Sequence, residues 1–381
     1  VHTAPSQHCR TRWTNQWSDV ALSIALKNVT KRFGDTVAVD NLSFAVNEGE
    51  LVALLGPSGG GKTTVLRLIA GLEAPSSGEI FIRGHCVNDL PVQDRNIGFV
   101  FQSYALFKSM NVFNNIAFGL RVRKWKKSAI ESRVNELMHL FGLEDLGHRY
   151  PHQLSGGQRQ RVAIARALAP KPDVLLLDEP FGAVDARIRQ ELRQWLVRLH
   201  HQFKVTTLFV THDQEEAMEV ASRIGILNRG RLEQVGSPQE VYEQPANEFV
   251  ARFIGAMNVL ELEVHGGVAR HGEIIFPVPE HSDGAKVRVG FRPYSVQIST
   301  CIGEYPYRAV IKHVYFLGIM MRLDLELASG LTICTRLTKE EYKRLGLAPG
   351  IQVSFRIAEF RVLGVESNMN QRFEGRDSIE C

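Results

Sequence analysis

The chain has 381 residues, with 45 basic and 41 acidic side chains and a formal net charge of +4 at pH 7. This length is enough for about two domains. The nearly balanced charge, without a long run of one sign, gives no indication of a nucleic-acid partner. No stretch approaches the roughly 18 apolar residues of a membrane-spanning helix. The five cysteines lack C-x-x-C spacing, which argues against a zinc site or a disulfide framework.

Residues 1–20 are expected to form an irregular extension, and residues 21–236 an α/β domain. In this domain short apolar runs alternate with helical patterns, which predicts strands that pair in parallel. The segment from about 103 to 170 has mainly helical patterns and is expected to form a helical subdomain. The predicted strands span residues 51–55, 97–101, 174–178 and 206–211.

The first of these strands leads into a phosphate-loop motif, G-x-x-x-x-G-K-T, which is followed by a helical pattern. The glycines let successive backbone N–H groups face one phosphate chain, and the start of the helix adds partial positive charge. In this motif Lys62 reaches the β- and γ-phosphates, and the Thr63 hydroxyl ligates Mg²⁺. The residues expected to bind the nucleotide are Gly56, Pro57, Ser58, Gly59, Gly60, Gly61, Lys62, Thr63 and Thr64.

The predicted strand at 174–178 ends in two acids, Asp178 and Glu179. Open α/β sheets bind ligands at the carboxyl ends of their strands. There Asp178 is expected to hold Mg²⁺, directly or through water, and Glu179 to polarise the water that attacks a phosphate. An acidic pair at a strand end can instead cap the next helix, but the upstream phosphate loop favours the catalytic interpretation.

A second glycine-containing motif lies between the phosphate loop and the acidic pair. Ser155 can serve as the N-cap of the helical run that follows it, and the two glycines after it allow close approach of a ligand to the backbone. The helix would present its positive end to a phosphate. The motif consists of Leu154, Ser155, Gly156, Gly157 and Gln158.

In their order and spacing, the phosphate loop, the LSGGQ motif and the strand ending in Asp178 and Glu179 resemble the ATP-binding cassette of ABC transporters. The resemblance implies a P-loop ABC ATPase domain of α/β class with a helical subdomain. It also implies a homodimer in which the LSGGQ motif of one chain contacts the ATP bound by its partner.

Further positions match motifs of the same family. Gln102 matches the Q-loop glutamine, which senses Mg²⁺ and the water, and His212 matches the switch histidine, which contacts the γ-phosphate. Phe33 matches the aromatic residue that stacks on adenine, and Asp185 belongs to the expected D-loop. The resemblance thus implies these catalytic residues and Mg²⁺ ligands: Glu179, His212 and Gln102 for catalysis, and Thr63, Gln102 and Asp178 for the metal.

The pattern changes after residue 236. Residues 237–258 are expected to form a linker helix, residues 259–370 a small all-β domain, and residues 371–381 a tail. The β assignment depends on a period of two, as in Leu323, Leu325 and Leu327, and predicts an OB-like barrel. This region resembles the TOBE-type accessory domain of bacterial importer ATPases, through Phe291-Arg292-Pro293.

Within the importer ATPases, residues 92–102, 189–220 and 291–296 resemble the sulfate/thiosulfate branch, and residues 190–205 carry the best evidence for it. The resemblance implies an ATPase that uses ATP and Mg²⁺ to energise import of sulfate or thiosulfate. The same ATPase role in an importer for a sugar, a polyamine or another oxyanion such as molybdate is the alternative, because the membrane subunits and a binding protein select the solute.

The implied partners are two transmembrane permease subunits and a solute-binding protein, with no nucleic acid. The implied location is peripheral, on the cytoplasmic face of the inner membrane or on the stromal face of a plastid envelope. A soluble cassette ATPase acting on DNA or ribosomes is a different class, which usually carries two cassettes or long insertions. A non-catalytic anion-sensing regulator is disfavoured because Glu179 and His212 are intact.

Overall fold

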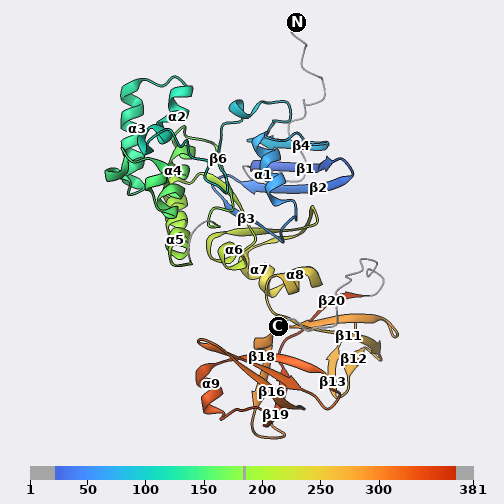
Figure 1. Ribbon diagram of the computed structural model, residues 1–381. Helices are drawn as coiled ribbons and strands as arrows, with labels where there is room; N and C mark the ends of the chain where they lie inside the picture. The colour runs from blue at the N-terminus through green and yellow to red at the C-terminus, as the bar shows by residue number, and fades with distance from the viewer. Residues whose placement is uncertain (1–21, 183–185, 366–381) are drawn as a thin grey trace. The chain divides into compact units, whose positions relative to one another are not determined.

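The computed structural model describes residues 22–182 and 186–365. It forms two compact units, divided between Glu240 and Val241. The first contains the mixed sheet and most of the helices, and the second is mainly β (Figure 1). Asp185, the expected D-loop residue, lies outside the described residues.

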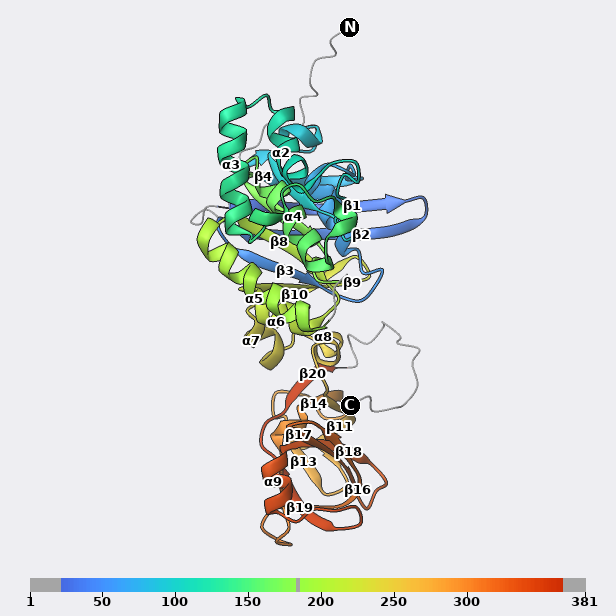
Figure 2. The same ribbon diagram turned by 60° about the vertical axis from the view of Figure 1, so that its left-hand side comes forward.

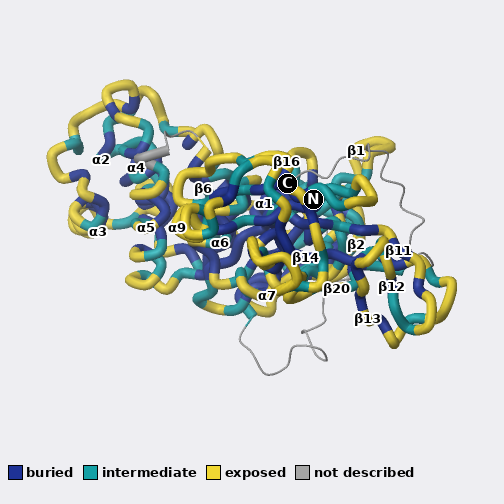
Figure 3. Tube along the Cα trace, turned by 90° about the horizontal axis from the view of Figure 1, so that it is seen from below, coloured by how far each residue is buried: buried dark blue, intermediate teal, exposed yellow. Residues whose placement is uncertain are grey.

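The first unit is built on a six-stranded sheet with the order β10-β9-β3-β8-β7-β6. Apart from the antiparallel pair β9–β10, neighbouring strands are parallel, as the sequence predicts. All residues of β3, β7 and β8 are buried, which explains their largely apolar sequences. Buried residues are coloured dark blue in Figure 3. The strands are β3 (Leu51–Leu55), β6 (Ile97–Val100), β7 (Val174–Asp178), β8 (Thr206–Thr211), β9 (Arg223–Asn228) and β10 (Arg231–Gly236).

A four-stranded antiparallel sheet, which the sequence pattern did not predict, packs against α1 (Lys62–Ala70) and the central sheet. Register shifts interrupt the pairing of β1 with both of its neighbours, so its burial does not follow a simple period of two. Cys86 of this sheet is disulfide-bonded, which the cysteine spacing did not predict. The strands, in sheet order, are β2 (Thr36–Asn47), β1 (Leu22–Phe33), β4 (Ser77–Ile82) and β5 (His85–Cys86).

Three helices gather on one side of this unit as the predicted helical subdomain (Figures 1 and 2). They are α2 (Val112–Val122), α3 (Lys127–Leu140) and α4 (Gly156–Leu168). Two more helices, α5 (Ala186–Phe203) and α6 (Gln214–Val220), pack against each other. No helix in the described ranges is long and apolar enough to span a membrane. Short 3₁₀ helices span Val92–Asp94, Glu144–Leu146, Pro151–Gln153 and Pro293–Ser295.

The second unit contains two five-stranded, wholly antiparallel sheets around one apolar core. Residues 328–330 form the predicted turn between β17 and β18, and Thr338 forms the predicted capping box with Glu341 at the start of α9 (Lys339–Arg344). One sheet is β13 (Ile274–Pro277), β12 (Val268–His271), β11 (Asn258–His265), β14 (Lys286–Phe291) and β20 (Arg361–Val365). The other is β15 (Val296–Ser299), β19 (Gln352–Ile357), β16 (Tyr307–Leu317), β17 (Met320–Glu326) and β18 (Thr332–Thr338).

Arg292 links the helices of the second unit to its β structure. The predicted linker helix is broken into α7 (Pro238–Glu243) and α8 (Glu248–Phe253), with Pro245 between them. The Arg292 guanidinium is buried and lies 4.3 Å from the centre of the Tyr242 ring. It donates hydrogen bonds to the backbone carbonyls of Tyr242, Ala251, Gly255 and Ala256.

We expect Arg292→Leu to lower the free energy of unfolding of the second unit by about 3 kcal/mol, because it leaves buried carbonyls without donors. Thermal unfolding followed by circular dichroism would measure the loss. Arg270→Leu, at an exposed position of β12, is the matched control and should change stability little. Equal effects of the two substitutions would contradict this role of Arg292.

Candidate active site

Four adjacent strands deliver the predicted site residues to one edge of the central sheet. β3 runs into the phosphate loop, β8 into His212, β7 into Glu179 and β6 toward Gln102. These strands are neighbours in the order β3-β8-β7-β6 and are parallel. Their carboxyl ends therefore lie side by side, where open α/β sheets bind ligands.

The phosphate loop packs closely against neighbouring backbone, which explains its glycines. A Cβ atom on Gly56 would lie 2.1 Å from the Leu227 carbonyl oxygen. Gly61 has φ +94°, and a Cβ there would lie 2.4 Å from the Ala38 carbonyl oxygen. Side chains at either position would displace the loop whose N–H groups are expected to face phosphate.

Lys62 folds back over this loop. Its side chain is buried, and Nζ donates hydrogen bonds of 2.8 Å to the carbonyl oxygens of both Gly56 and Pro57. Burial lowers the pKa of the Lys62 ammonium, while the nearby carboxylates of Glu179 and Asp178 oppose this shift. The Lys62 amino group thus lies against the phosphate loop, where a phosphate would favour its charged form.

Asp178 faces the first turn of α1. Its Oδ1 atom accepts a hydrogen bond of 2.9 Å from the Thr63 hydroxyl. Burial raises the pKa of Asp178, the Thr63 hydrogen bond opposes the rise, and the charge of Glu179 adds to it. Two hard oxygen atoms, from residues 115 positions apart in the sequence, are thereby brought together.

Glu179 stands at the centre of a three-residue cluster. Its Oε2 accepts a hydrogen bond of 2.8 Å from Gln102 Nε2, and its Oε1 lies 3.2 Å from His212 Nδ1. The backbone of Glu179 has φ +45°, a conformation that is uncommon for residues other than glycine. Such strained backbone concentrates at functional sites. The structure therefore brings together the three residues predicted to be catalytic.

The LSGGQ motif has the local structure predicted for it. Ser155 is the N-cap of α4: its hydroxyl accepts a hydrogen bond from the Gln158 N–H, and the Gln158 side chain accepts one from the Ser155 N–H. Leu154 is buried, whereas Ser155 is exposed. The positive end of a 13-residue helix is thus fixed by a capping box and open to solvent.

Phe33 lies at the end of β1 with 47% of its surface exposed. Lys31 Nζ lies 4.7 Å from the centre of its ring. Phe33 pairs with Thr36 in the β1–β2 hairpin. This hairpin also carries Ala38, whose carbonyl borders Gly61. An aromatic face is thus available on a hairpin that packs against the phosphate loop.

The sequence of this chain matches two protein families and several known proteins. Residues 39–182 match the ABC transporter family, and residues 308–363 match the TOBE domain. The sulfate/thiosulfate import ATP-binding protein of Nitrosomonas europaea is 48% identical over 87% of this chain and 94% of its own length. The protein of the same description from Synechococcus elongatus is 49% identical over 90% and 97%.

The chain belongs to the family of sulfate/thiosulfate import ATP-binding proteins. This confirms the resemblance inferred from the sequence and the expected fold class, an ABC ATPase domain followed by a TOBE-type domain. We call the first unit the ABC unit.

The ABC unit also matches solved cassette structures. A dimeric post-hydrolysis structure of the ATP-binding cassette MJ0796, bound to ADP and Pi, has a TM-score of 0.51 and 36% sequence identity, and covers 56% of this chain and 98% of that one. CbiO1 from Clostridium perfringens, part of an ABC transporter complex, has a TM-score of 0.55 and 29% identity, and covers 59% and 92%.

Sequence reasoning missed one arginine of the ABC unit that contacts the segment after Gln102. Arg166 of α4 donates hydrogen bonds to the carbonyls of Tyr104 and Ala105, at 2.9 and 2.7 Å. Both of these residues have positive φ, 61° and 43°. The helix that begins at the LSGGQ motif is therefore tied to the loop that carries Gln102. A helical arginine carries no sequence signal for such a contact.

We expect Gly61→Ala to weaken ATP binding about tenfold or more, because both the left-handed backbone and the contact with Ala38 oppose a side chain there. Equilibrium titration with a fluorescent ATP analogue would measure the Kd. Gly84→Ala is the matched control, since Gly84 has φ +74° and no atom lies within 4 Å of the position that its Cβ would occupy. A Kd unchanged in Gly61→Ala would show that this close packing does not matter for binding.

Proposed function

We propose that this chain is the ATP-hydrolysing subunit of an importer for sulfate or thiosulfate. The observation that carries the ATPase role is the Glu179 carboxylate, bonded to Gln102 and next to His212 at the sheet edge that also holds the phosphate loop. The solute follows from the relatives, which are sulfate/thiosulfate import proteins over nearly their whole length.

In the proposed reaction the phosphate loop and Lys62 hold the triphosphate while Glu179 orients the attacking water and withdraws its proton. His212 would contact the γ-phosphate and hold the Glu179 side chain in position. Gln102 would link Glu179 to the helical subdomain. Phosphoryl transfer depends mainly on position and charge neutralisation, which these few groups supply. Phe33 would stack on the adenine ring.

The residues present suit Mg²⁺. Thr63 and Asp178 offer hard oxygen ligands, and the Gln102 side chain offers another, which is the ligand type that Mg²⁺ prefers together with phosphates. Burial raises the pKa of Asp178 and so disfavours its ionised form. A bound cation would favour the ionised form. When bound, Mg²⁺ would neutralise charge on the phosphate oxygens.

Two copies of the chain are proposed to close around two ATP molecules. The capped, exposed start of α4 at Ser155 suits a phosphate that another chain presents. The solved cassette MJ0796 is described as a dimer bound to ADP and Pi. Asp185 would contribute to the same interface as part of the D-loop.

The proposed partners are two transmembrane permease subunits and a solute-binding protein, with this chain peripheral to the membrane on its cytoplasmic face, or on the stromal face if the membrane is a plastid envelope. This chain would supply the energy of ATP hydrolysis, and its partners would form the transport path and select the solute. An importer of another solute would use the same kind of ATPase subunit.

We expect Glu179→Gln to accumulate an ATP-bound dimer, because the groups that bind ATP remain while the water is no longer activated. Light scattering with ATP and Mg²⁺ would show the doubled mass. Glu131→Gln, at a glutamate of α3 with a 53% exposed side chain, should behave as the wild type does. A Glu179→Gln protein that stays monomeric at saturating ATP would contradict the two-site dimer.

The solute is tested by uptake of labelled sulfate in cells that lack their own sulfate ATPase. We expect the wild-type chain to restore uptake and the Glu179→Gln chain to fail, since transport needs hydrolysis. Restored uptake of molybdate, a sugar or a polyamine without sulfate would retain the ATPase and overturn the assigned solute.

A further inference from the structure

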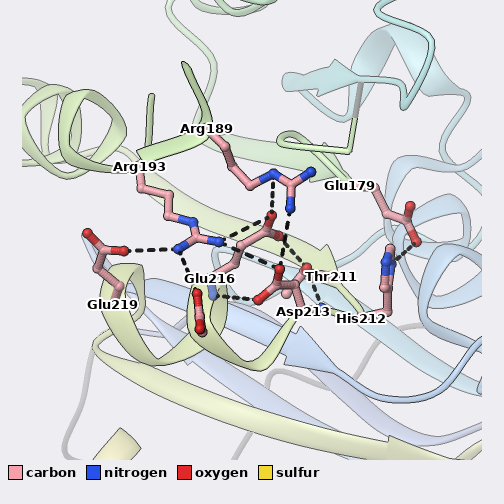
Figure 4. A network of polar contacts seen from close by, with 9 residues as sticks. Glu179, Arg189, Arg193, Thr211, His212, Asp213, Glu216 and Glu219 are labelled. Carbon is pink, nitrogen blue, oxygen red and sulfur yellow. Dashed lines mark hydrogen bonds and ion pairs between the residues drawn. The ribbon is translucent and has the colours of Figure 1, made fainter. Parts of the chain in front are cut away.

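Both neighbours of His212 are bonded to Glu216 (Figure 4). The Thr211 hydroxyl donates a hydrogen bond of 2.5 Å to Glu216 Oε2 and accepts one from the Asp213 N–H. The Asp213 carboxylate accepts a hydrogen bond from the Glu216 N–H, at the start of α6. The short segment that carries His212 is therefore attached, on each side, to one buried glutamate.

Two arginines of α5 close this arrangement from the opposite side (Figure 4). Arg193 is buried, and its guanidinium lies 3.6 Å from Asp213, 3.8 Å from Glu216 and 3.2 Å from Glu219. Arg189 lies 3.7 Å from Asp213 and 3.9 Å from Glu216. We call Arg189, Arg193, Asp213 and Glu216 the α5–α6 network.

The opposite contacts of α5 lie in the helical subdomain. The Trp195 ring packs edge-on against Phe141, which follows α3, with 5.0 Å between ring centres. Arg161 of α4 lies 5.9 Å from the centre of the same Trp195 ring. Through Trp195, α5 thus contacts the subdomain that carries the LSGGQ motif. Two residues earlier in the sequence, Arg193 of the same helix faces the segment that carries His212. The helix also begins at Ala186, directly after the expected D-loop residue Asp185.

We propose that the α5–α6 network positions His212 for hydrolysis and transmits movement of α5 to it. The network residues are positioning residues: they reach the reaction only through the backbone of residues 211–213. This inference rests on the catalytic role proposed above for His212. Its consequence is that a shift of the helical subdomain changes the rate of hydrolysis without any change in the groups that bind ATP.

The cost of the network argues for more than a structural role. Asp213 alone supplies the N-cap of the seven-residue helix α6. Glu216 is only 4% exposed, and burial raises the pKa of its carboxyl group. A buried cluster of charges is often no more stabilising than apolar residues of similar volume, but its hydrogen bonds fix one geometry. Here that geometry includes the orientation of the segment beside Glu179.

The test is a double-mutant cycle on the full-length chain with Arg193→Met and His212→Ala, read as single-turnover hydrolysis of labelled ATP at excess protein. We expect Arg193→Met alone to slow hydrolysis roughly 10-fold to 100-fold, with the Kd for ATP changed less than about twofold. Arg198→Met, the same substitution at an exposed position of α5, is the matched control and should keep the wild-type rate.

In the His212→Ala background, Arg193→Met should cause less than about a twofold further loss, because both changes then act through one group. The same loss factor in both backgrounds, or no loss in the wild-type background, would overturn the coupling. A wild-type rate in His212→Ala alone would instead remove the catalytic role of His212; any loss from Arg193→Met would then act elsewhere, and the coupling would also fail.

Glu216→Gln is the second variant, since Arg193→Met removes one of the two cations that face the buried Glu216 and can impair folding. The glutamine keeps the volume and an acceptor for Thr211 while it removes the charge that faces Arg193. We expect the same pattern for Glu216→Gln: the rate of ATP hydrolysis falls and the Kd for ATP is unchanged. In the His212→Ala background the substitution should cause no further loss of rate. Thermal unfolding would show whether each variant is folded. If the Arg193→Met protein is not folded, the double-mutant cycle of Glu216→Gln with His212→Ala tests the coupling instead.

Discussion

The parallel order of four strands is the constraint on which the candidate active site depends. The phosphate loop, Gln102, Glu179 and His212 are far apart in the chain, yet each follows a strand of the sequence β3-β8-β7-β6. Parallel neighbours end at the same edge, so each strand delivers its polar residue without help from the loops. The observed parallel register of these strands sets the distances between the groups proposed to be catalytic, and the burial of β3, β7 and β8 keeps these strands in the interior of the unit.

That edge concentrates charge in a partly buried place. Asp178 and Glu179 are adjacent carboxylates, and Lys62 is the cation that lies nearest in the phosphate loop. Burial moves the pKa of Lys62 and that of Asp178 in the directions that disfavour their charged forms. A bound triphosphate with its cation would oppose both pKa shifts, since the phosphates pair with Lys62 and the cation places positive charge near Asp178. The site is therefore electrostatically arranged for a ligand.

The residues proposed to contact nucleotide carry local sequence signals, whereas the residues proposed to position them do not. The phosphate loop, the acidic pair and the N-cap Ser155 each have a local signal, because a glycine pattern, a strand end or a cap is a property of neighbouring residues. Arg166 and Arg193 have no such signal, since a helical arginine is usually a solvated side chain. Their partners lie 20 to 62 residues away. The antiparallel sheet was missed for a related reason: bulges in β1 remove the alternation by which a strand is recognised.

The choice of arginine in these positions has a physical consequence. A guanidinium offers several donors in one rigid plane, so Arg193 can face Asp213, Glu216 and Glu219 at once, whereas a lysine is a point charge on a flexible stem. Because one guanidinium faces all three carboxylates, a movement of α5 that displaces Arg193 changes its contacts with Asp213, Glu216 and Glu219 together. The loop beside His212 must then follow the helix or lose its ion pairs. Such a connection fits the proposed transmission of α5 movement to His212.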